Sequence, residues 1–274
     1  MPTFVLAFPA IDPVIVAIGP FAIRWYALAY IAGIVLGWRY ALHLVRRPPQ
    51  FMDAVAMDDF VVWATLGVIV GGRLGYVLFY KPGYYLFHPE EIVFVWRGGM
   101  SFHGGLIGVV LAIVLFARRR GLSLFALGDV VAAATPIGLF FGRIANFING
   151  ELWGRPSDVA WAMVFPGDVN RLPRHPSQLY EAAFEGLALF LFLFWLARRP
   201  ALRERPGRLG GWFLVGYALA RMSGELFREP DAHLGFIVAG VTMGQLLSLP
   251  MLLVGIWLIA SSARRALPAA KASV

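Results

Sequence analysis

The chain has 274 residues, of which 59% are apolar and only 15% charged, and its mean hydropathy is +0.70. Soluble globular domains carry about 25% charged residues, so this composition predicts a multi-pass membrane protein. The sequence has no cysteine, which excludes disulfides, an enzyme thiolate and cysteine-ligated metals. The net charge of +8 comes from basic residues in short loops between apolar runs, a pattern that indicates membrane topology rather than nucleic-acid binding.

Seven apolar runs approach the length of about 20 residues that crosses a membrane as a helix. They lie at about 20–40, 59–80, 103–117, 124–142, 179–197, 209–227 and 238–262. The expected fold is therefore an all-α polytopic membrane protein with seven transmembrane helices, formed by a single domain, 1–274.

The distribution of basic residues predicts the orientation of these helices. With the N-terminus outside, the inner loops and the C-terminal tail hold twice as many Lys and Arg side chains as the outer segments. The positive-inside rule therefore favours an outer N-terminus and an inner C-terminus. The two longest outer segments, about 81–100 and 143–178, are then expected to form a small cap on the outer face.

Three of the predicted helices, all running from inside to outside, carry an arginine: Arg73, Arg143 and Arg221. At about 1.5 Å per residue, Arg221 lies roughly 18 Å and Arg73 roughly 21 Å from the inner end of its helix, in a core about 30 Å thick. An arginine at that depth faces a hydrated cavity or pairs with an anion. Glu225, one turn after Arg221, offers an internal ion pair, whereas a bound phosphate would fit the fork of the guanidinium group.

Polar residues concentrate in the stretch 142–154, GRIANFINGELWG, which follows an apolar run. If this stretch continues a helix, Arg143, Asn146 and Gly150 share one face, with Glu151 beside them. A charged face at the end of a membrane helix predicts a functional site.

Other polar residues have both a functional and a structural interpretation. His103, in SFHGGLIG at the outer end of the third helix, can accept a proton near neutral pH, or simply lies at a helix end. Tyr26 and Tyr217 are candidates for hydrogen bonds to lipid oxygens, or for interface and core packing. Asp129 and Glu181 are expected to compensate helix N-termini. The histidine spacings do not support a metal site.

Several motifs closely resemble those of the prolipoprotein diacylglyceryl transferase family. They are DPVIVAIGPFAIRWY, GGRLGYVLFY, GGMSFHGGLIG, GRIANFINGELWG, LPRHPSQLYE, FREPD and VTMGQLLSLP, and they are spread over nearly the whole chain. The resemblance implies a seven-helix enzyme of the bacterial inner membrane whose site faces the periplasm. It also implies transfer of the diacylglyceryl group of phosphatidylglycerol to the lipobox cysteine of a prolipoprotein signal peptide, with release of glycerol 1-phosphate. The implied partners are these two substrates and the surrounding membrane lipids, without cofactor, metal or nucleic acid.

The resemblance also assigns roles to residues. Arg143 and Arg221 would hold the phosphate, and His103 would take the proton from the thiol or help to position it. The positions implied to bind phosphatidylglycerol are Tyr26, Arg73, Arg143, Asn146, Glu151, Gly154, Tyr217 and Glu225. Two other classes of protein remain open on the residues alone: a transporter or flippase of an anionic lipid, and a structural membrane scaffold.

Overall fold

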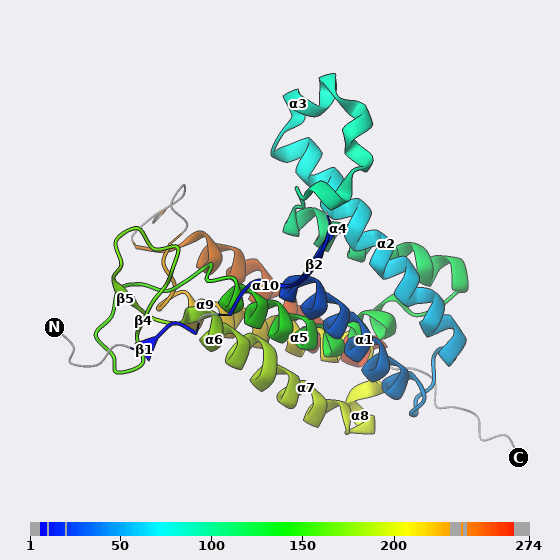
Figure 1. Cartoon of the computed structure of the whole chain (residues 1–274). Helices are drawn as coiled ribbons and strands as arrows, with labels where there is room; N and C mark the ends of the chain where they lie inside the picture. The colour runs from blue at the N-terminus through cyan, green and yellow to red at the C-terminus, as the bar shows by residue number, and fades with distance from the viewer. Residues whose placement is uncertain (1–5, 10, 20, 231–236, 238–239, 266–274) are drawn as a thin grey trace, which may run out of the picture. The chain divides into compact units, whose positions relative to one another are not determined.

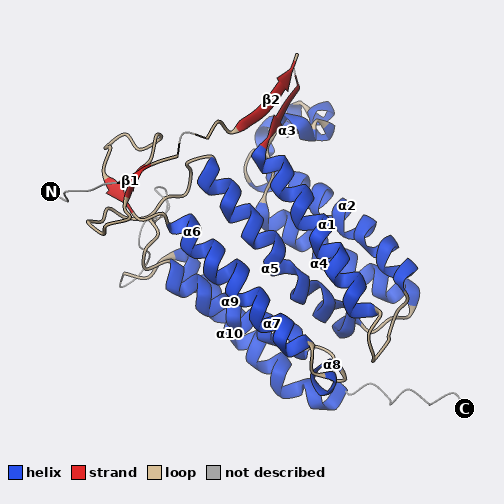
Figure 2. Ribbon diagram, turned by 60° about the horizontal axis from the view of Figure 1, so that its bottom comes forward, coloured by secondary structure: helices blue, strands red, loops and turns tan. Residues whose placement is uncertain are grey.

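The protein is predominantly helical, as the computed structural model in Figures 1 and 2 shows. The structure describes residues 6–9, 11–19, 21–230, 237 and 240–265. The first positions of the last predicted run, 238–239, lie outside the described residues.

Six helical stretches are long and apolar enough to cross a membrane. They are α1 (Trp25–Val45), α2 (Ala54–Phe79), α4 (Phe102–Arg120), α5 (Leu124–Ile148), the run Ser177–Ala197 and the run Met243–Arg265. The run Ser177–Ala197 joins α6 (Ser177–Glu181), a π-helical segment (Ala182–Ala188) and α7 (Leu189–Ala197), and the last run begins with α10 (Met243–Ser261). The multi-pass membrane fold expected from composition is thus present.

The predicted sixth run corresponds to α9 (Arg208–Gly224), which has 17 residues and follows the short helix α8 (Pro200–Arg203). At about 1.5 Å per residue, α9 is roughly 25 Å long, a little less than a hydrocarbon core of about 30 Å. It is therefore a helix, as predicted, but not one of the six long apolar stretches.

The start of the first predicted run was wrong. Residues Phe21–Arg24 form a strand, β3, that pairs in antiparallel fashion with β2 (Val14–Ile18), and α1 begins only at Trp25. Gly19, directly after β2, lies in a turn with φ of +60°, and an apolar count cannot distinguish such a turn from a helix start.

The described residues form two compact units: the first contains residues up to 41 and from 129 onward, and the second contains residues 42–128. In the second unit, α2 and α4 pack as an antiparallel pair. A Cβ atom at Gly67 would lie 2.6 Å from the Gly108 carbonyl oxygen, and one at Gly75 only 2.7 Å from Gly104 Cα. These contacts confirm that the glycines spaced by four along both helices serve close packing.

The ends of α2 and α4 follow from capping residues. The Asp53 carboxylate accepts the Ala56 N–H at 2.6 Å and starts α2, and the Ser101 hydroxyl accepts the Gly104 N–H at 3.2 Å and starts α4. The connection between the two helices contains α3 (Pro82–Phe87) and two 3₁₀ turns, Pro89–Val93 and Val95–Arg97.

In the first unit, the α9 and α10 helices run side by side (Figure 2). A Cβ at Gly211 of α9 would lie 2.8 Å from the Gly255 carbonyl oxygen of α10, so no side chain fits between them. The π-helical segment contacts α5 equally closely, since a Cβ at Gly186 would lie 2.6 Å from Phe140 Cβ. This contact brings Glu185 of the π-helical segment, and Glu181 at the end of α6, against the polar end of α5.

Two more strand pairs belong to this unit. The strand β4 (Met163–Val164) pairs in parallel with β1 (Leu6–Ala7) and in antiparallel fashion with β5 (Pro173–Arg174). Strands β4 and β5 lie in the segment after α5 that the sequence predicted as part of an outer cap, and β1 joins them from near the N-terminus.

Candidate functional site

Arg143 and Arg221 come together in the first unit, on opposite sides of a pair of buried glutamates. Arg143, on α5, lies 3.1 Å from Glu181 Oε2, and its Nε and Nη2 atoms donate to Glu185 Oε2 at 3.2 and 3.1 Å. Arg221, on α9, donates to Glu181 Oε1 at 2.6 Å and lies 3.7 Å from Glu185 Oε1. Both carboxylates are essentially unexposed, at 1% and 0%. The two arginines therefore share one pair of carboxylates.

Two more charged side chains complete this cluster. Glu225 forms an ion pair with Arg221 one helical turn earlier, and Arg228 lies 3.5 Å from Glu181 Oε1. Three guanidinium groups thus meet three carboxylates, Glu181, Glu185 and Glu225, and their formal charges balance. Balance matters because a buried charge is tolerated only when it is paired. We call these six residues the ion-pair network.

A second polar group begins one turn farther along α5. The Asn146 amide donates to the Tyr26 hydroxyl at 3.1 Å and to Glu151 Oε1 at 2.8 Å. Glu151 reaches this position because α5 ends at Ile148 and Gly150 adopts a left-handed conformation, with φ of +64°. Asn146 lies three residues after Arg143, so α5 presents both groups on one face, as the sequence predicted.

Gly154 occupies a position where the backbone of three segments converges. Its N–H donates to the His175 carbonyl at 2.9 Å, and a Cβ here would lie 2.5 Å from the Phe227 carbonyl oxygen and 2.7 Å from His175 Cβ. The next residue, Arg155, donates to the carbonyls of Arg228 and Glu225 at 2.9 and 3.1 Å. The segment after α5 therefore holds the residues that directly follow α9, which include Glu225 and Arg228 of the ion-pair network.

The same segment has an ion pair of its own. Asp168 accepts from Arg174 Nε at 2.7 Å, and Arg174 also lies 3.2 Å from Glu229. The Arg174 hydrogen bond holds the pKa of the Asp168 carboxyl below its usual value, and burial lowers the pKa of His175. This pair fixes the loop that ends in the His175 carbonyl bound by Gly154.

Arg73 lies in the second unit, where its guanidinium is occupied by main-chain oxygens. Nε donates to Ile92, Nη2 to Glu91 and Nη1 to Gly98 and Gly99, at 2.7 to 3.1 Å, and the side chain is 4% exposed. Because α2 begins at Ala54, earlier than predicted, Arg73 lies about 28 Å along the helix, close to its far end. These contacts favour a structural role for Arg73, and its role in lipid binding stays a prediction.

His103 is also in the second unit, as the second residue of α4. It is exposed and lies edge-on to the ring of Phe102, at 5.6 Å between ring centroids. His103 belongs to the second unit and Arg143 and Arg221 to the first, and their expected convergence stays a prediction. Tyr217 lies one turn before Arg221 on α9 and stacks on Phe213 at 5.9 Å.

Sequence reasoning missed the carboxylates that pair with Arg143. Glu181 was expected to compensate a helix N-terminus, and Glu185 and Arg228 were not considered. The signal was present, because two glutamates four residues apart (YEAAFEG) lie at the start of an apolar run. Asp129 does compensate an N-terminus, but that of α9, since it accepts the N–H groups of Gly207 and Gly210 at 2.8 and 2.6 Å. Within the described residues, no group of three or more His, Asp or Glu side chains is placed to hold a metal ion.

The fold and the ion-pair network together define a multi-pass membrane protein with a charged site enclosed by its helices. Such sites occur in enzymes and transporters alike. The chain belongs to the prolipoprotein diacylglyceryl transferase family, whose sequence model matches residues 13–261.

Curated relatives agree with this family over almost their whole length. The chain is 64% identical to the phosphatidylglycerol–prolipoprotein diacylglyceryl transferase of Paramagnetospirillum magneticum, over 98% of this chain and 100% of the relative. It is 62% identical to the transferases of the same name from Azospirillum brasilense, over 95% and 97%, and Rhodospirillum rubrum, over 97% and 97%. The resemblance drawn from the motifs is thereby confirmed.

Proposed function

We propose that this chain transfers the diacylglyceryl group of phosphatidylglycerol to the thiol of a prolipoprotein cysteine and releases glycerol 1-phosphate. The observation that carries this proposal is the full-length identity of more than 60% to transferases of that name. The arginine pair supports it, because a phosphate that leaves with added negative charge is stabilised by guanidinium donors.

The proposed setting is the bacterial inner membrane, with α9 as a seventh crossing, the N-terminus outside and the C-terminus inside. The charge distribution of the loops supports this orientation. The whole chain then acts as one membrane domain, with 81–100 and 143–178 as a cap at the periplasmic face. Arg143, Asn146 and Gly154 lie at the outer end of α5 or after it, so the site opens to the periplasm and the outer leaflet.

In the proposed chemistry, Arg143 and Arg221 bind the phosphate of phosphatidylglycerol. In the resting site their donors point at Glu181 and Glu185, so phosphate binding requires at least one N–H to exchange a carboxylate for a phosphate oxygen. Glutamates 181 and 185 then act as positioning residues that hold both forks in place. Removal of one charge-stabilising donor costs about a hundred- to a thousandfold in rate, and we expect at least this loss for Arg143→Ala and for Arg221→Ala.

The remaining lipid contacts are proposed at the positions implied by the family. Tyr26 and Asn146, already hydrogen bonded to one another, are placed to bind oxygens of the glycerol or the phosphate. Tyr217 precedes Arg221 by one helical turn, and the Glu225 carboxylate orients the Arg221 guanidinium. The other positions proposed to shape the lipid site are Arg73, Glu151 and Gly154.

The acceptor thiol is proposed to react directly. A free cysteine has a pKa of about 8.5, so a base is needed near neutral pH. His103 takes the thiol proton or positions the thiol. The sulfur then attacks the carbon of the diacylglyceryl unit that is bonded to the phosphate oxygen. The carbon–oxygen bond breaks, the electron pair leaves with the phosphate oxygen, and the new thioether retains the diacylglyceryl group.

One incubation tests the proposal against its main rival, a transporter of anionic lipid. The purified protein is mixed with phosphatidylglycerol labelled in the diacylglycerol part and with a lipobox peptide. We expect the label on the peptide and free glycerol 1-phosphate, and no label on a peptide with serine in place of the cysteine. Movement of labelled lipid across a vesicle membrane without any labelled peptide would favour the transporter.

A further inference from the structure

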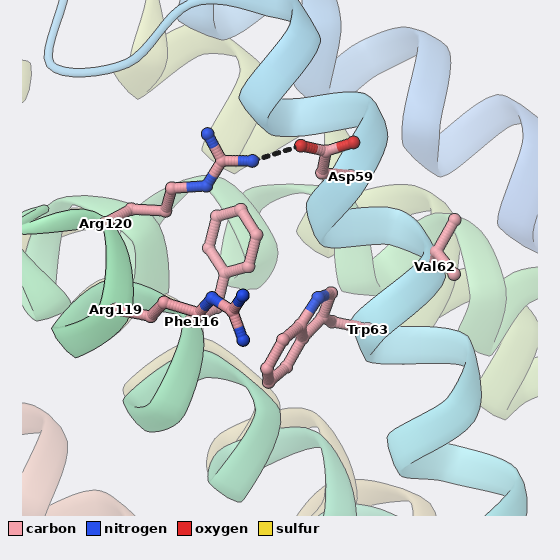
Figure 3. A pocket seen from close by; sticks show the side chains of 6 residues that line it. All are labelled: Asp59, Val62, Trp63, Phe116, Arg119 and Arg120. Carbon is pink, nitrogen blue, oxygen red and sulfur yellow. Dashed lines mark hydrogen bonds and ion pairs between the residues drawn. The ribbon is translucent and has the colours of Figure 1, made fainter.

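A small cavity in the second unit lies where α2 begins and α4 ends, and no step of the proposed reaction uses it. Its volume is about 240 Å³, and it is lined by Asp59, Val62, Trp63, Phe116, Arg119 and Arg120 (Figure 3). Phe116 forms its floor, at 1% exposure, and packs edge-on against Trp63 at 5.9 Å between ring centroids.

The charged lining favours an anion. Arg120 forms an ion pair with Asp59, which neutralises one positive charge. Arg119 lies over the ring of Trp63, with 6.0 Å between its guanidinium carbon and the ring centroid. Among the ion pairs of the described residues, none includes Arg119, whereas Asp59 pairs with Arg120. The N-terminal part of α2 and the C-terminal end of α4 meet here, so the partial charges of the two helix ends oppose each other. The charged side chains therefore determine the sign of the electrostatic potential in the cavity. The cavity thus keeps one guanidinium fork with free donors.

The surroundings of the cavity are those of a membrane interface. Trp63 is of the type enriched where lipid headgroups meet the hydrocarbon, and Arg118 adds a third charge at the same helix end. Farther from these helix ends than most of the cavity lining, Leu66 of α2 and Leu115 of α4 are 56% and 52% exposed. A molecule with a phosphate in the cavity and acyl chains over these leucines would match both parts of the surface.

We infer that this cavity binds the phosphate of an anionic phospholipid, which in the proposed orientation belongs to the cytoplasmic leaflet. A volume of about 240 Å³ exceeds that of several water molecules, at about 30 Å³ each, and so admits a phosphate with part of its headgroup. Arg119 holds the phosphate oxygens with its fork, and Trp63 packs under the guanidinium. Basic pockets at the cytoplasmic ends of membrane helices are typical sites for acidic headgroups. The assignment of the leaflet depends on the proposed orientation, but the lipid site itself does not.

The test is binding of phosphatidylserine to the detergent-purified protein, measured by native mass spectrometry. Phosphatidylcholine, a zwitterion with no net charge, is the reference lipid. One arginine near a membrane surface contributes about 1 kcal/mol, which is about fivefold in affinity. We expect Arg119→Ala to weaken phosphatidylserine binding at least fivefold more than Arg118→Ala, which removes an equal charge that does not line the cavity. Equal losses in the two variants would refute the site.

A second variant changes binding in the opposite direction, so that a folding defect cannot imitate the result. Asp59→Asn releases Arg120 from its ion pair and should strengthen phosphatidylserine binding about fivefold, whereas Asp58→Asn, next to it in sequence, should not. No difference between these two variants would contradict the inference. Soluble glycerol phosphate serves as the competitor: displacement of the lipid at equal concentration would identify a soluble phosphate ligand and overturn the lipid assignment.

Discussion

The sharpest prediction concerns the pair formed by Arg143 and Glu185, in which a structural and a catalytic role can be separated. Two hydrogen bonds of 3.1 and 3.2 Å join these buried side chains. Removal of one partner of a buried pair costs about 3–5 kcal/mol, because the network of three arginines and three glutamates is then left with one uncompensated buried charge. Arg143→Met and Glu185→Met should therefore each lower the free energy of unfolding by about this amount. The double variant removes one charge of each sign and leaves a balanced network, so it should be no less stable than either single variant.

Activity should follow a different pattern. If Arg143 binds the phosphate, Arg143→Met and the double variant both lose at least about a hundredfold in kcat/KM. Glu185→Met should lose less, since Glu181 still holds Arg143 at 3.1 Å. Unfolding is measured by denaturant titration in detergent, and transfer by label on the lipobox peptide. Recovery of transfer in the double variant to within tenfold of the original enzyme would show that Arg143 serves only as an ion-pair partner.

Three other predictions follow from particular side chains. His103→Gln should slow transfer by about a hundredfold or more, and an unchanged rate over pH 6–9 would exclude His103 from the chemistry. The lowered pKa of Asp168 means that its ion pair with Arg174 stabilises the protein above a pH of about 4, and that this stabilisation is lost as the pH falls below the pKa of the folded state. Asp168→Asn should therefore make the fall of Tm in acid less steep. An equally steep fall in this variant would contradict the prediction. Gly67→Ala places a methyl group 2.6 Å from a main-chain oxygen of α4 and should lower the free energy of unfolding by about 1–3 kcal/mol. Gly128→Ala is the control, because a Cβ there has no neighbouring atom within 4 Å, and it should be neutral or slightly stabilising. Equal effects of the two variants would argue against the close helix contact.

Much of the fold was predictable because the apolar runs are long and glycines mark the close helix contacts. The glycines spaced by four on α2 and α4 face one another as expected for helices packed in lipid. The exception was the segment before Trp25, where β2 and β3 have the apolar composition of a helix. An apolar hairpin and the start of a membrane helix look alike in composition, and only the pairing of the strands distinguishes them.

The site was predictable where partners are close in sequence. Glu225 follows Arg221 by four residues and Asn146 follows Arg143 by three, so helical periodicity placed them together. The contacts of Arg143 with Glu181 and Glu185 join helices about 40 residues apart, and no local pattern gives the depth and rotation of one helix against another. For the same reason, the relation of His103 to Arg143 could not be derived from spacing and stays a prediction.

The way in which Arg73 holds the segment 91–99 has a consequence for sequence variation. All four of its hydrogen bonds end on main-chain oxygens, and none on a side chain of that segment. A segment anchored in this way can exchange its own side chains without loss of the anchor, whereas Arg73 itself cannot be exchanged even for lysine, which lacks the fork. Saturation mutagenesis should therefore find one intolerant position on α2 beside a segment in which most non-glycine positions accept many residues.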